Sequence, residues 1–362
     1  MDNALLQNEQ YTKNPYRFGY IYDPPEQESD WLIVTFSAFP PASSTVKHQY
    51  SFTKLTKPFP CHRLFIQDTP GEMGCYYLCC DLNFKYNAAV RNLIKRICRE
   101  HQIPSSHIIT VGSSKGGTAS LIYALQLHAG HCITMVPQTR IGSFVRSTRP
   151  DIFRFMIGEQ TDPDEGQRIL DNVVFDQLKT RKRTVIHLLT TRGDSQFTEH
   201  IEPLIEQLQT CHSYYNDIRI NNRIANHHDI SNFSREYFRE TMEDILSGRR
   251  KWGGISEPYP RVSLPIGEIV LRHKITFLKR SVRIDLILSP KAGKMIPVPQ
   301  FDFYLHRADR TVVERKYFSA KHSAAFRIPE PGRYYLRYYV KSGDEKISVP
   351  LSVFNFPATE AK

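Results

Sequence analysis

The stretch 107–125, HIITVGSSKGGTASLIYAL, constrains the fold of this chain more than any other segment. A β-branched run at 108–111 predicts a strand, and apolar residues at helical spacing after the turn predict a helix. Between the two lies Gly112-x-Ser114-x-Gly116. A strand that turns sharply into a helix is the context a nucleophile elbow requires, and small residues around the serine permit its strained backbone. The segment therefore predicts an α/β fold with Ser114 at a sheet edge.

The motif alone leaves two other roles open for this turn. Ser113 or Ser114 could cap the helix, as serine commonly does, or the turn could bind an anion at the helix N-terminus. The P-loop pattern fails, because Lys115 comes three residues after Gly112 and no Lys-Ser/Thr pair follows a second glycine. A nucleophilic serine also needs partners elsewhere in the chain.

The rest of residues 1–248 alternates between strand and helix patterns. Apolar runs predict strands at 31–36, 62–68, 107–111, 132–136 and 184–190, with a weaker strand at 214–220. Helical periodicity predicts helices at 86–101, 114–128, 165–179 and 231–246. This alternation predicts an α/β-hydrolase-like domain at 1–248, with a mostly parallel sheet flanked by helices.

The pattern changes after residue 248. The segment GRRKWGG at 248–254 reads as the start of a linker, which we place at 249–264. Beyond Pro265 the helical period disappears, and short strands with turn signals follow at 268–278, 282–288, 300–306, 312–318, 323–328, 333–340 and 345–354. About seven strands over 265–357 predict a small all-β sandwich of immunoglobulin-like type.

The net charge of +11 is unevenly distributed along the chain. Residues 256–362 contain 19 Lys and Arg against 10 Asp and Glu, a net of +9, whereas the remaining residues have a net of +2. A basic half favours an anionic partner such as nucleic acid, an anionic lipid surface or an acidic polysaccharide, unless it is only a solubilising surface. Its Tyr and Phe alternate as strand residues and match no recognition motif, so nucleic acid is not expected.

The cysteine content and the apolar runs indicate where the protein is located and whether it binds a metal. No run of 18 apolar residues suggests a membrane span, and the N-terminus resembles no signal peptide. The seven cysteines include no C-x-x-C pair. The cluster Cys75, Cys79 and Cys80 has only His62 nearby, which is too few ligands for zinc. We therefore expect no metal, reduced thiols and a cytoplasmic location.

Two later loops offer partners for Ser114 in the order of an α/β-hydrolase triad: serine, acid, histidine. Asp194 follows the strand at 184–190, although an Asx turn would also explain an aspartate there. His227 and His228 precede the last predicted helix, and an exposed polar loop or a metal site are the other interpretations of their segment. We favour His228 as the base, because the residue nearer the helix is better fixed, and keep His227 as the alternative.

An oxyanion hole needs two backbone N–H groups directed at the developing negative charge. Lys115, directly after the serine, is expected to supply one of them. The other is expected from Ser37 or Ala38, in the loop that follows the strand at 31–36, where small side chains allow close approach.

With these residues assembled, the chain resembles the α/β-hydrolase fold and, more narrowly, the bacterial polysaccharide O-acetyltransferases of capsule biosynthesis. The G-S-S-K-G-G elbow and the F-S-A loop after the first strand carry the resemblance, which covers residues 30–245. It implies transfer of an acetyl group from acetyl-CoA to sugar hydroxyls of an anionic capsular polysaccharide. Ser114 would be acetylated, His228 would be the base and Asp194 would orient it.

The resemblance also implies a place near the capsule synthesis machinery at the inner membrane surface. Triad chemistry does not separate a transferase from a hydrolase, since either water or a sugar can take the acyl group. A serine esterase or deacetylase acting on glycans is therefore one alternative. A non-catalytic polysaccharide-binding module is the other.

Overall fold

The computed structural model describes residues 8–13, 16–40, 48–179, 184–212, 216–221, 224–248, 254–264, 267–278, 281–290, 299–307, 309–342 and 345–356. The chain forms two compact units. The first unit comprises Met1–Leu189, Ser195–Leu204 and His227–Arg249, and the second comprises Thr190–Asp194, Ile205–Asn226 and Arg250–Lys362.

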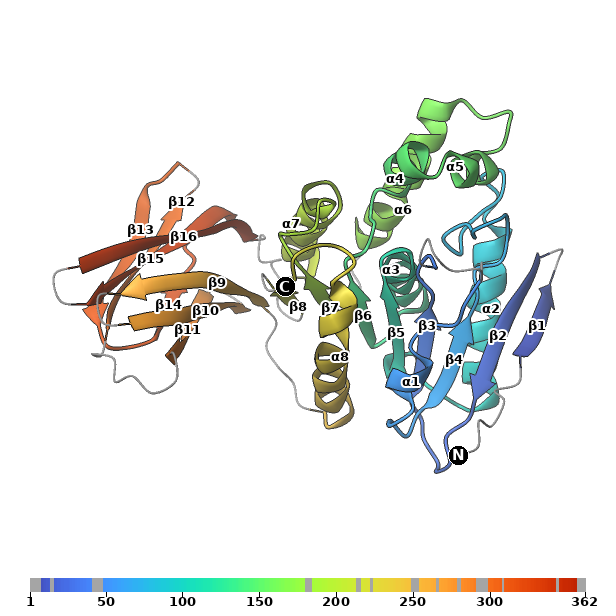
Figure 1. Ribbon diagram of the computed structural model, residues 1–362, viewed down its shortest axis with the longest axis horizontal. Helices are drawn as coiled ribbons and strands as arrows, with labels where there is room; N and C mark the ends of the chain where they lie inside the picture. The colour runs from blue at the N-terminus through green and yellow to red at the C-terminus, as the bar shows by residue number, and fades with distance from the viewer. Residues whose placement is uncertain are drawn as a thin grey trace. The chain divides into compact units, whose positions relative to one another are not determined.

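The first unit is built on a mostly parallel sheet (Figure 1). Its strand order is β1-β2-β4-β3-β5-β6-β7. The pairs β1–β2 and β2–β4 are antiparallel, and the pairs from β4–β3 to β6–β7 are parallel. The strands are β1 (Asn8–Lys13), β2 (Tyr16–Asp23), β3 (Leu32–Phe36), β4 (His62–Ile66), β5 (Ile108–Ser113), β6 (His131–Met135) and β7 (Val185–Thr190). The side chains of β3 are all buried, as expected for a strand covered on both faces.

Helices flank this sheet (Figure 1). The α-helices of this unit are α1 (Thr53–Thr56), α2 (Lys85–Glu100), α3 (Lys115–Leu127), α4 (Ile141–Thr148), α5 (Pro150–Ile157), α6 (Pro163–Lys179) and α8 (Ile230–Leu246). Helix α7 (Glu202–His212) begins in the first unit and continues in the second. Helix α3 packs on β5 and β6, and twelve of its thirteen residues are buried. The predicted α/β-hydrolase-like fold class is confirmed. The strands β1 and β2 and the helices α1, α4, α5 and α7 were not predicted.

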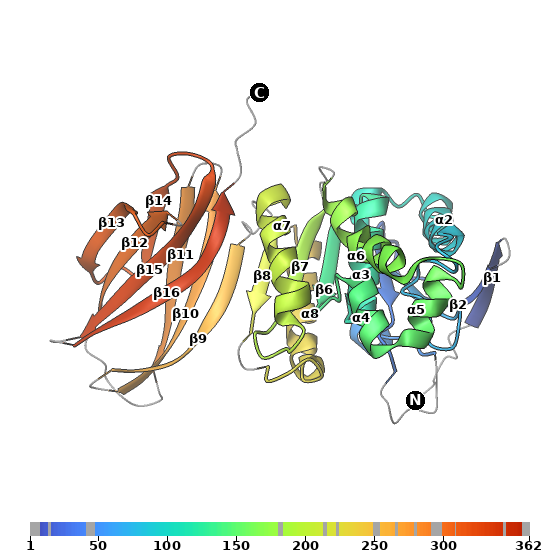
Figure 2. The ribbon, with the colours of Figure 1, turned by 90° about the horizontal axis from the view of Figure 1, so that it is seen from above.

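The second unit contains two sheets (Figure 2). One has the order β8-β9-β10-β11-β14 and is antiparallel except for the pair β8 and β9, and the other is antiparallel with the order β13-β12-β15-β16. The strands are β8 (Asp217–Ile220), β9 (Gly254–Leu264), β10 (Gly267–Leu278), β11 (Ser281–Pro290), β12 (Gln300–Arg307), β13 (Val312–Ser319), β14 (Ser323–Arg327), β15 (Gly332–Ser342) and β16 (Glu345–Phe356). The expectation of an all-β C-terminal region is confirmed.

The predicted linker at 249–264 is wrong where the structure describes it. Residues 254–264 form strand β9, which pairs antiparallel with β10. Glycines and basic residues suggested a linker, but pairing with a long neighbouring strand satisfies the backbone and overrides weak local propensity. Residues 249–253 lie outside the described part of the chain.

A pair of histidines on neighbouring strands is expected to make the stability of the first unit depend on pH. His131 Nδ1 of β6 lies 3.2 Å from His187 Nε2 of β7. Burial, together with the charges of His187 and His107, lowers the pKa of His131 to about 3. An unfolded histidine titrates near pH 6.5, so between about pH 6.5 and 3 the unfolded state binds a proton that the folded state does not. The free energy of unfolding therefore falls as the pH falls.

We expect His131→Asn to reduce this pH dependence, by up to about 1.4 kcal/mol for each pH unit in that window. Urea unfolding of both proteins, just above and about one unit below pH 6.5, measures the difference. The matched control is His128→Asn, because His128 is exposed and its left-handed φ of 53° suits asparagine. Equal pH dependence in wild type and His131→Asn would contradict the assignment.

Candidate active site

Ser114 lies at a strained turn between β5 and α3. Its φ of 53° and ψ of −123° are unusual for a residue with a side chain. Its N–H donates to Met135 O of β6 at 2.9 Å, and its carbonyl accepts from Thr118 N–H at 3.0 Å. Its side chain makes no capping bond to α3, a helix that lies wholly within the described chain. The geometry is that of a nucleophile elbow and excludes the capping role for this serine.

The glycines of the motif are required by close backbone packing. A Cβ on Gly112 would lie 2.0 Å from Gly116 O, and a Cβ on Gly116 would lie 2.3 Å from Phe36 O of β3. A Cβ on Gly117 would lie 2.8 Å from Met135 O. The first turn of α3 thus packs directly on the sheet backbone, as the Gly-x-Ser-x-Gly spacing predicts.

A histidine from the loop before α8 reaches the serine. His227 Nε2 lies 2.9 Å from Ser114 Oγ, within hydrogen-bonding distance of a nucleophile and its base. Both side chains are partly exposed. The hydroxyl can therefore give its proton to this imidazole.

The prediction that His228, rather than His227, contacts the Ser114 hydroxyl is wrong. His228 is exposed, and its ring centroid lies 5.9 Å from that of His227 at an interplanar angle of 85°. Its carbonyl accepts a hydrogen bond from Ser231 Oγ at 3.1 Å, which fixes the entry into α8. Proximity to the helix does fix His228, but it is the preceding residue, the alternative, that faces Ser114.

Asp194 belongs to the second unit and is buried. It ends a tight loop in which its N–H donates to Thr191 O at 3.3 Å and Gly193 N–H donates to Thr191 Oγ1 at 3.0 Å. Thr191 Oγ1 in turn donates to Ile224 O at 2.6 Å. Its assignment as the carboxylate of a triad stays a prediction.

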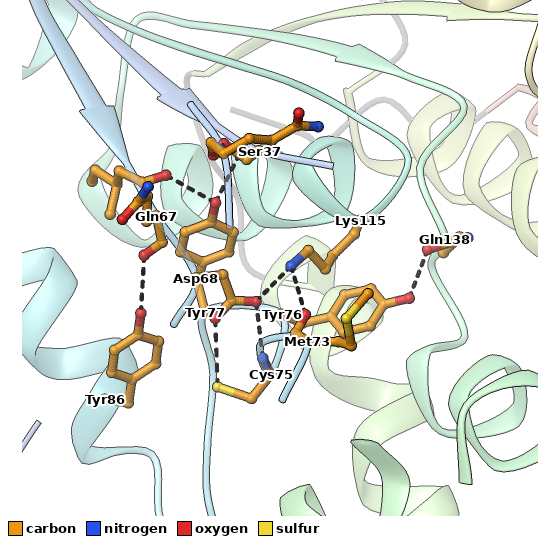
Figure 3. Close-up of polar contacts among 12 residues, drawn as sticks. Ser37, Gln67, Asp68, Met73, Cys75, Tyr76, Tyr77, Tyr86, Lys115 and Gln138 are labelled. Carbon is orange, nitrogen blue, oxygen red and sulfur yellow. Dashed lines mark hydrogen bonds and ion pairs between the residues drawn. The ribbon is translucent and has the colours of Figure 1, made fainter. Parts of the chain in front are cut away.

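The loop after β3 narrows the choice of oxyanion donor. The N–H of Ser37 donates to Tyr77 Oη at 2.7 Å, and this hydroxyl donates to Ile66 O at 3.0 Å (Figure 3). The N–H of Ser37 therefore already has an acceptor, which favours Ala38 over Ser37. The assignment of an oxyanion donor in this loop stays a prediction. Ala38 N–H donates to none of the residues that the structure describes. Together with the N–H of Lys115, which as the first residue of α3 has no intrahelical acceptor, it is the remaining candidate.

The Lys115 side chain forms a buried ion pair that sequence reasoning missed. Its Nζ lies 3.0 Å from Asp68 Oδ2 and 3.2 Å from Met73 O, and both ionic side chains are at most 3% exposed (Figure 3). Asp68 Oδ2 also accepts from Cys75 N–H at 2.9 Å. The Lys115 ammonium lies 4.7 Å from the centre of the Phe39 ring. The ion pair ties the residue after Ser114 to the segment that follows β4.

Two tyrosines in that segment hold the neighbouring loops. Tyr76 and Tyr77 have φ values of 56° and 59° and are fully buried, and burial raises the pKa of each well above its usual range. Tyr76 Oη donates to Gln138 Oε1 at 2.6 Å (Figure 3). Gln138 N–H donates to Thr118 Oγ1 of α3 at 2.9 Å. A Cβ on Gly74 would lie 2.3 Å from Asp68 Oδ2, so a glycine is needed there. The neutral hydroxyl groups of Tyr76 and Tyr77 thus hold the two loops beside the Ser114 turn, at Gln138 and at Ser37.

Metal binding and membrane insertion can both be addressed within the described residues. They contain no group of three or more His, Cys, Asp or Glu side chains placed to hold a metal ion. Among the helices described, none combines the length and the apolarity needed to cross a bilayer.

The elbow, its histidine and the mostly parallel sheet define the α/β-hydrolase fold. Comparison with protein-family models gives no match, and comparison with the curated proteins gives none either. Solved structures do match. The capsule O-acetyltransferase of Neisseria meningitidis serogroup A is similar at a TM-score of 0.55 and 20% identity, over 67% of this chain and 96% of its own.

Two further structures show the same likeness. A histidine-to-alanine variant of the meningococcal enzyme in complex with CoA has a TM-score of 0.54 at 21% identity, over 66% of this chain and 96% of its own. The Gap123 glycosylation-associated protein complex from Streptococcus agalactiae has a TM-score of 0.57 at 19% identity, over 68% of this chain and 48% of that chain. At such identities the similarity shows the fold alone.

Proposed function

We propose that this protein is a serine-dependent O-acetyltransferase that moves an acetyl group from acetyl-CoA to sugar hydroxyls of an anionic capsular polysaccharide. The observation that carries the proposal is the 2.9 Å contact between His227 Nε2 and Ser114 Oγ at a strained elbow. Similarity in fold to the meningococcal capsule O-acetyltransferase, which has also been solved with CoA, supports acetyl-CoA as the donor.

In the first half-reaction, His227 accepts the proton of Ser114 while Oγ attacks the thioester carbonyl. The N–H groups of Lys115 and Ala38 would stabilise the oxyanion of the tetrahedral intermediate. When the C–S bond breaks, His227 returns the proton to the CoA thiolate, and the acetyl group remains on Ser114. Asp194 would orient and stabilise the imidazolium.

In the second half-reaction, a sugar hydroxyl gives its proton to His227 and attacks the acetyl carbonyl. Collapse of the second intermediate breaks the bond to Ser114 Oγ, which recovers the proton, and the sugar ester leaves. The net charge of +9 in residues 256–362 favours a polyanionic acceptor. We place this reaction in the cytoplasm, close to the capsule synthesis machinery at the inner membrane.

We expect brief exposure to acetyl-CoA to add one acetyl group to the protein, located on Ser114 by peptide mass spectrometry. Ser114→Ala is expected to remove the adduct without loss of folding, because the side chain makes no bond except that to His227 in the described chain. Adding polymer should discharge the acetyl-enzyme and acetylate the sugar. Release of free acetate with unmodified polymer would instead indicate an esterase, and an unlabelled Ser114 would contradict the mechanism.

A further inference from the structure

The second unit contains the β13-β12-β15-β16 sheet (Figure 2). One face of this sheet combines aromatic rings with cations. Alternate residues of β12 and β15 point into the core, and among these Phe303, Leu305 and Tyr338 are at most 2% exposed. The other face of the sheet presents a set of larger polar and charged side chains. We call it the aromatic–basic face and define it by Tyr304, Arg315, Tyr317, Arg337, Tyr339 and Lys346.

Strand register brings these residues together. Tyr304 of β12 is paired with Arg315 of β13 and with Arg337 of β15, and directly paired residues lie on the same side of a sheet. The Arg315 guanidinium lies 4.8 Å from the centre of the Tyr304 ring and 4.3 Å from that of Tyr317. Tyr317 is 72% exposed, so an open ring stands next to a fixed cation.

The cations of the face outnumber its carboxylate. Asp302 is fully buried beneath Arg315 and accepts from it at 2.6 Å, which holds the guanidinium in place. Arg337 and Lys346 add positive charge, and hydrogen bonding to Arg337 is the main cause that lowers the pKa of Tyr339. The Lys346 ammonium lies 4.0 Å from the centre of that same ring.

A like-charge pair on this face gives a further indication of an anion. Lys341 of β15 lies directly opposite Lys346 of β16 in the ladder. Like charges at directly opposed positions destabilise a sheet, so a bound anionic group would relieve their repulsion. Neither the fold nor the elbow requires two lysines at this register.

We propose that the aromatic–basic face binds the anionic polysaccharide chain, an inference that rests on the function proposed above. Sugar rings have apolar C–H faces that pack on tyrosine rings, and their anionic groups would pair with Arg315, Lys341 and Lys346. The cations 4.0–4.8 Å from the centres of the Tyr304, Tyr317 and Tyr339 rings place positive charge directly beside the aromatic surface, as a charged glycan requires. Single-stranded nucleic acid also combines stacking with charge, so it is included in the test as the competing ligand.

The test compares two triple variants of the full-length protein. The face variant combines Tyr317→Ser, Lys341→Gln and Lys346→Gln. The control combines Ile287→Ser, Lys321→Gln and Arg327→Gln. It also removes one large exposed apolar side chain and two charges, but from β11, β14 and the turn before β14. Both leave the Asp302–Arg315 pair intact. Binding is measured with a phosphodiester-linked N-acetylmannosamine polymer, neutral dextran and oligothymidylate.

We expect the face variant to bind the anionic polymer about tenfold more weakly and the control to stay within about twofold, with a difference that shrinks at high salt. Equal weakening in the two variants, no polymer binding by the wild type, or tighter binding of oligothymidylate would overturn the proposal. Acetylation of Ser114 by acetyl-CoA, measured in the same proteins, reports on the proposed function alone. A chain that binds polymer without forming the acetyl-enzyme would leave the surface assignment standing and reject the chemistry.

Discussion

Replacing His227 with alanine is expected to lower kcat by about 10⁴-fold or more, whereas His228→Ala is expected to change kcat less than about threefold. The reason is the position of a single imidazole. His227 Nε2 lies 2.9 Å from Ser114 Oγ, and without it the hydroxyl has no base in the described part of the chain. His228, exposed one residue later, fixes the helix entry through its carbonyl, which alanine retains.

The two variants differ by one position, so each is the matched control of the other. The measurement is the rate of CoA release from acetyl-CoA in the presence of polymer, together with labelling of Ser114 by a fluorophosphonate probe. Circular dichroism checks that both variants fold. If His228→Ala is inactive and His227→Ala retains activity, the assignment of the base is wrong.

The elbow was predictable because its signals are local. The β-branched run, the glycine spacing and the helical period all lie within 107–125. They predict the strand β5, the tight turn at Ser114 and the helix α3 in that order, without reference to the rest of the chain. The alternation of strands in the second unit is similarly local, and the strands at 300–306 and 333–340 are found there as β12 and β15.

The sequence could not predict which of the two adjacent histidines, His227 or His228, contacts Ser114. Both lie in one loop with the same flanking residues, and a shift of one residue changes which side chain faces the serine. The path of the loop into α8 decides, and it depends on tertiary contacts. The same reasoning applies to Ser37 and Ala38, because the hydroxyl of Tyr77, forty residues away in the chain, occupies one of the two amides.

The short helices α4 and α5 were missed for a different reason. Each has eight residues, about two turns, which is too short for an apolar period to stand out. Pro150 begins α5 directly after α4, where it serves as a helix N1 residue rather than a breaker. Strand β9 was missed because its partner β10 stabilises a segment that resembles a linker in composition.

The buried ion pair between Asp68 and Lys115 has no signature in the sequence at all. The two residues are 47 positions apart, and Lys115 was expected to act only through its backbone N–H. A lysine directly after the nucleophile, only 3% exposed, needs a carboxylate because an unpaired ammonium in such a site is costly. Its partner comes just after β4, the strand next to β3 in the sheet.

Asp68→Asn is expected to lower the free energy of unfolding by about 3–5 kcal/mol, because it leaves the Lys115 ammonium buried without its counter-charge. Lys115→Met is expected to lower the free energy of unfolding by a similar amount, because it leaves the Asp68 carboxylate buried without its counter-charge. The double variant Asp68→Asn with Lys115→Met should recover most of the lost stability, since neither side chain then carries a buried charge without a counter-charge. The asparagine oxygen still accepts the hydrogen bond from Cys75 N–H. Urea unfolding of the three variants measures the coupling.

The matched control is Asp164→Asn, which breaks an ion pair to Arg146 with a shorter contact, 2.6 Å against 3.0 Å, between side chains that are 41% and 84% exposed. We expect this change to cost less than about 1 kcal/mol. A comparable cost for Asp68→Asn and Asp164→Asn would show that burial does not strengthen the inner pair. Activity distinguishes a structural role of the ion pair from a positioning role. The double variant should regain stability but not full kcat if, as we propose, the Lys115 N–H stabilises the oxyanion, because the ion pair holds that residue in place.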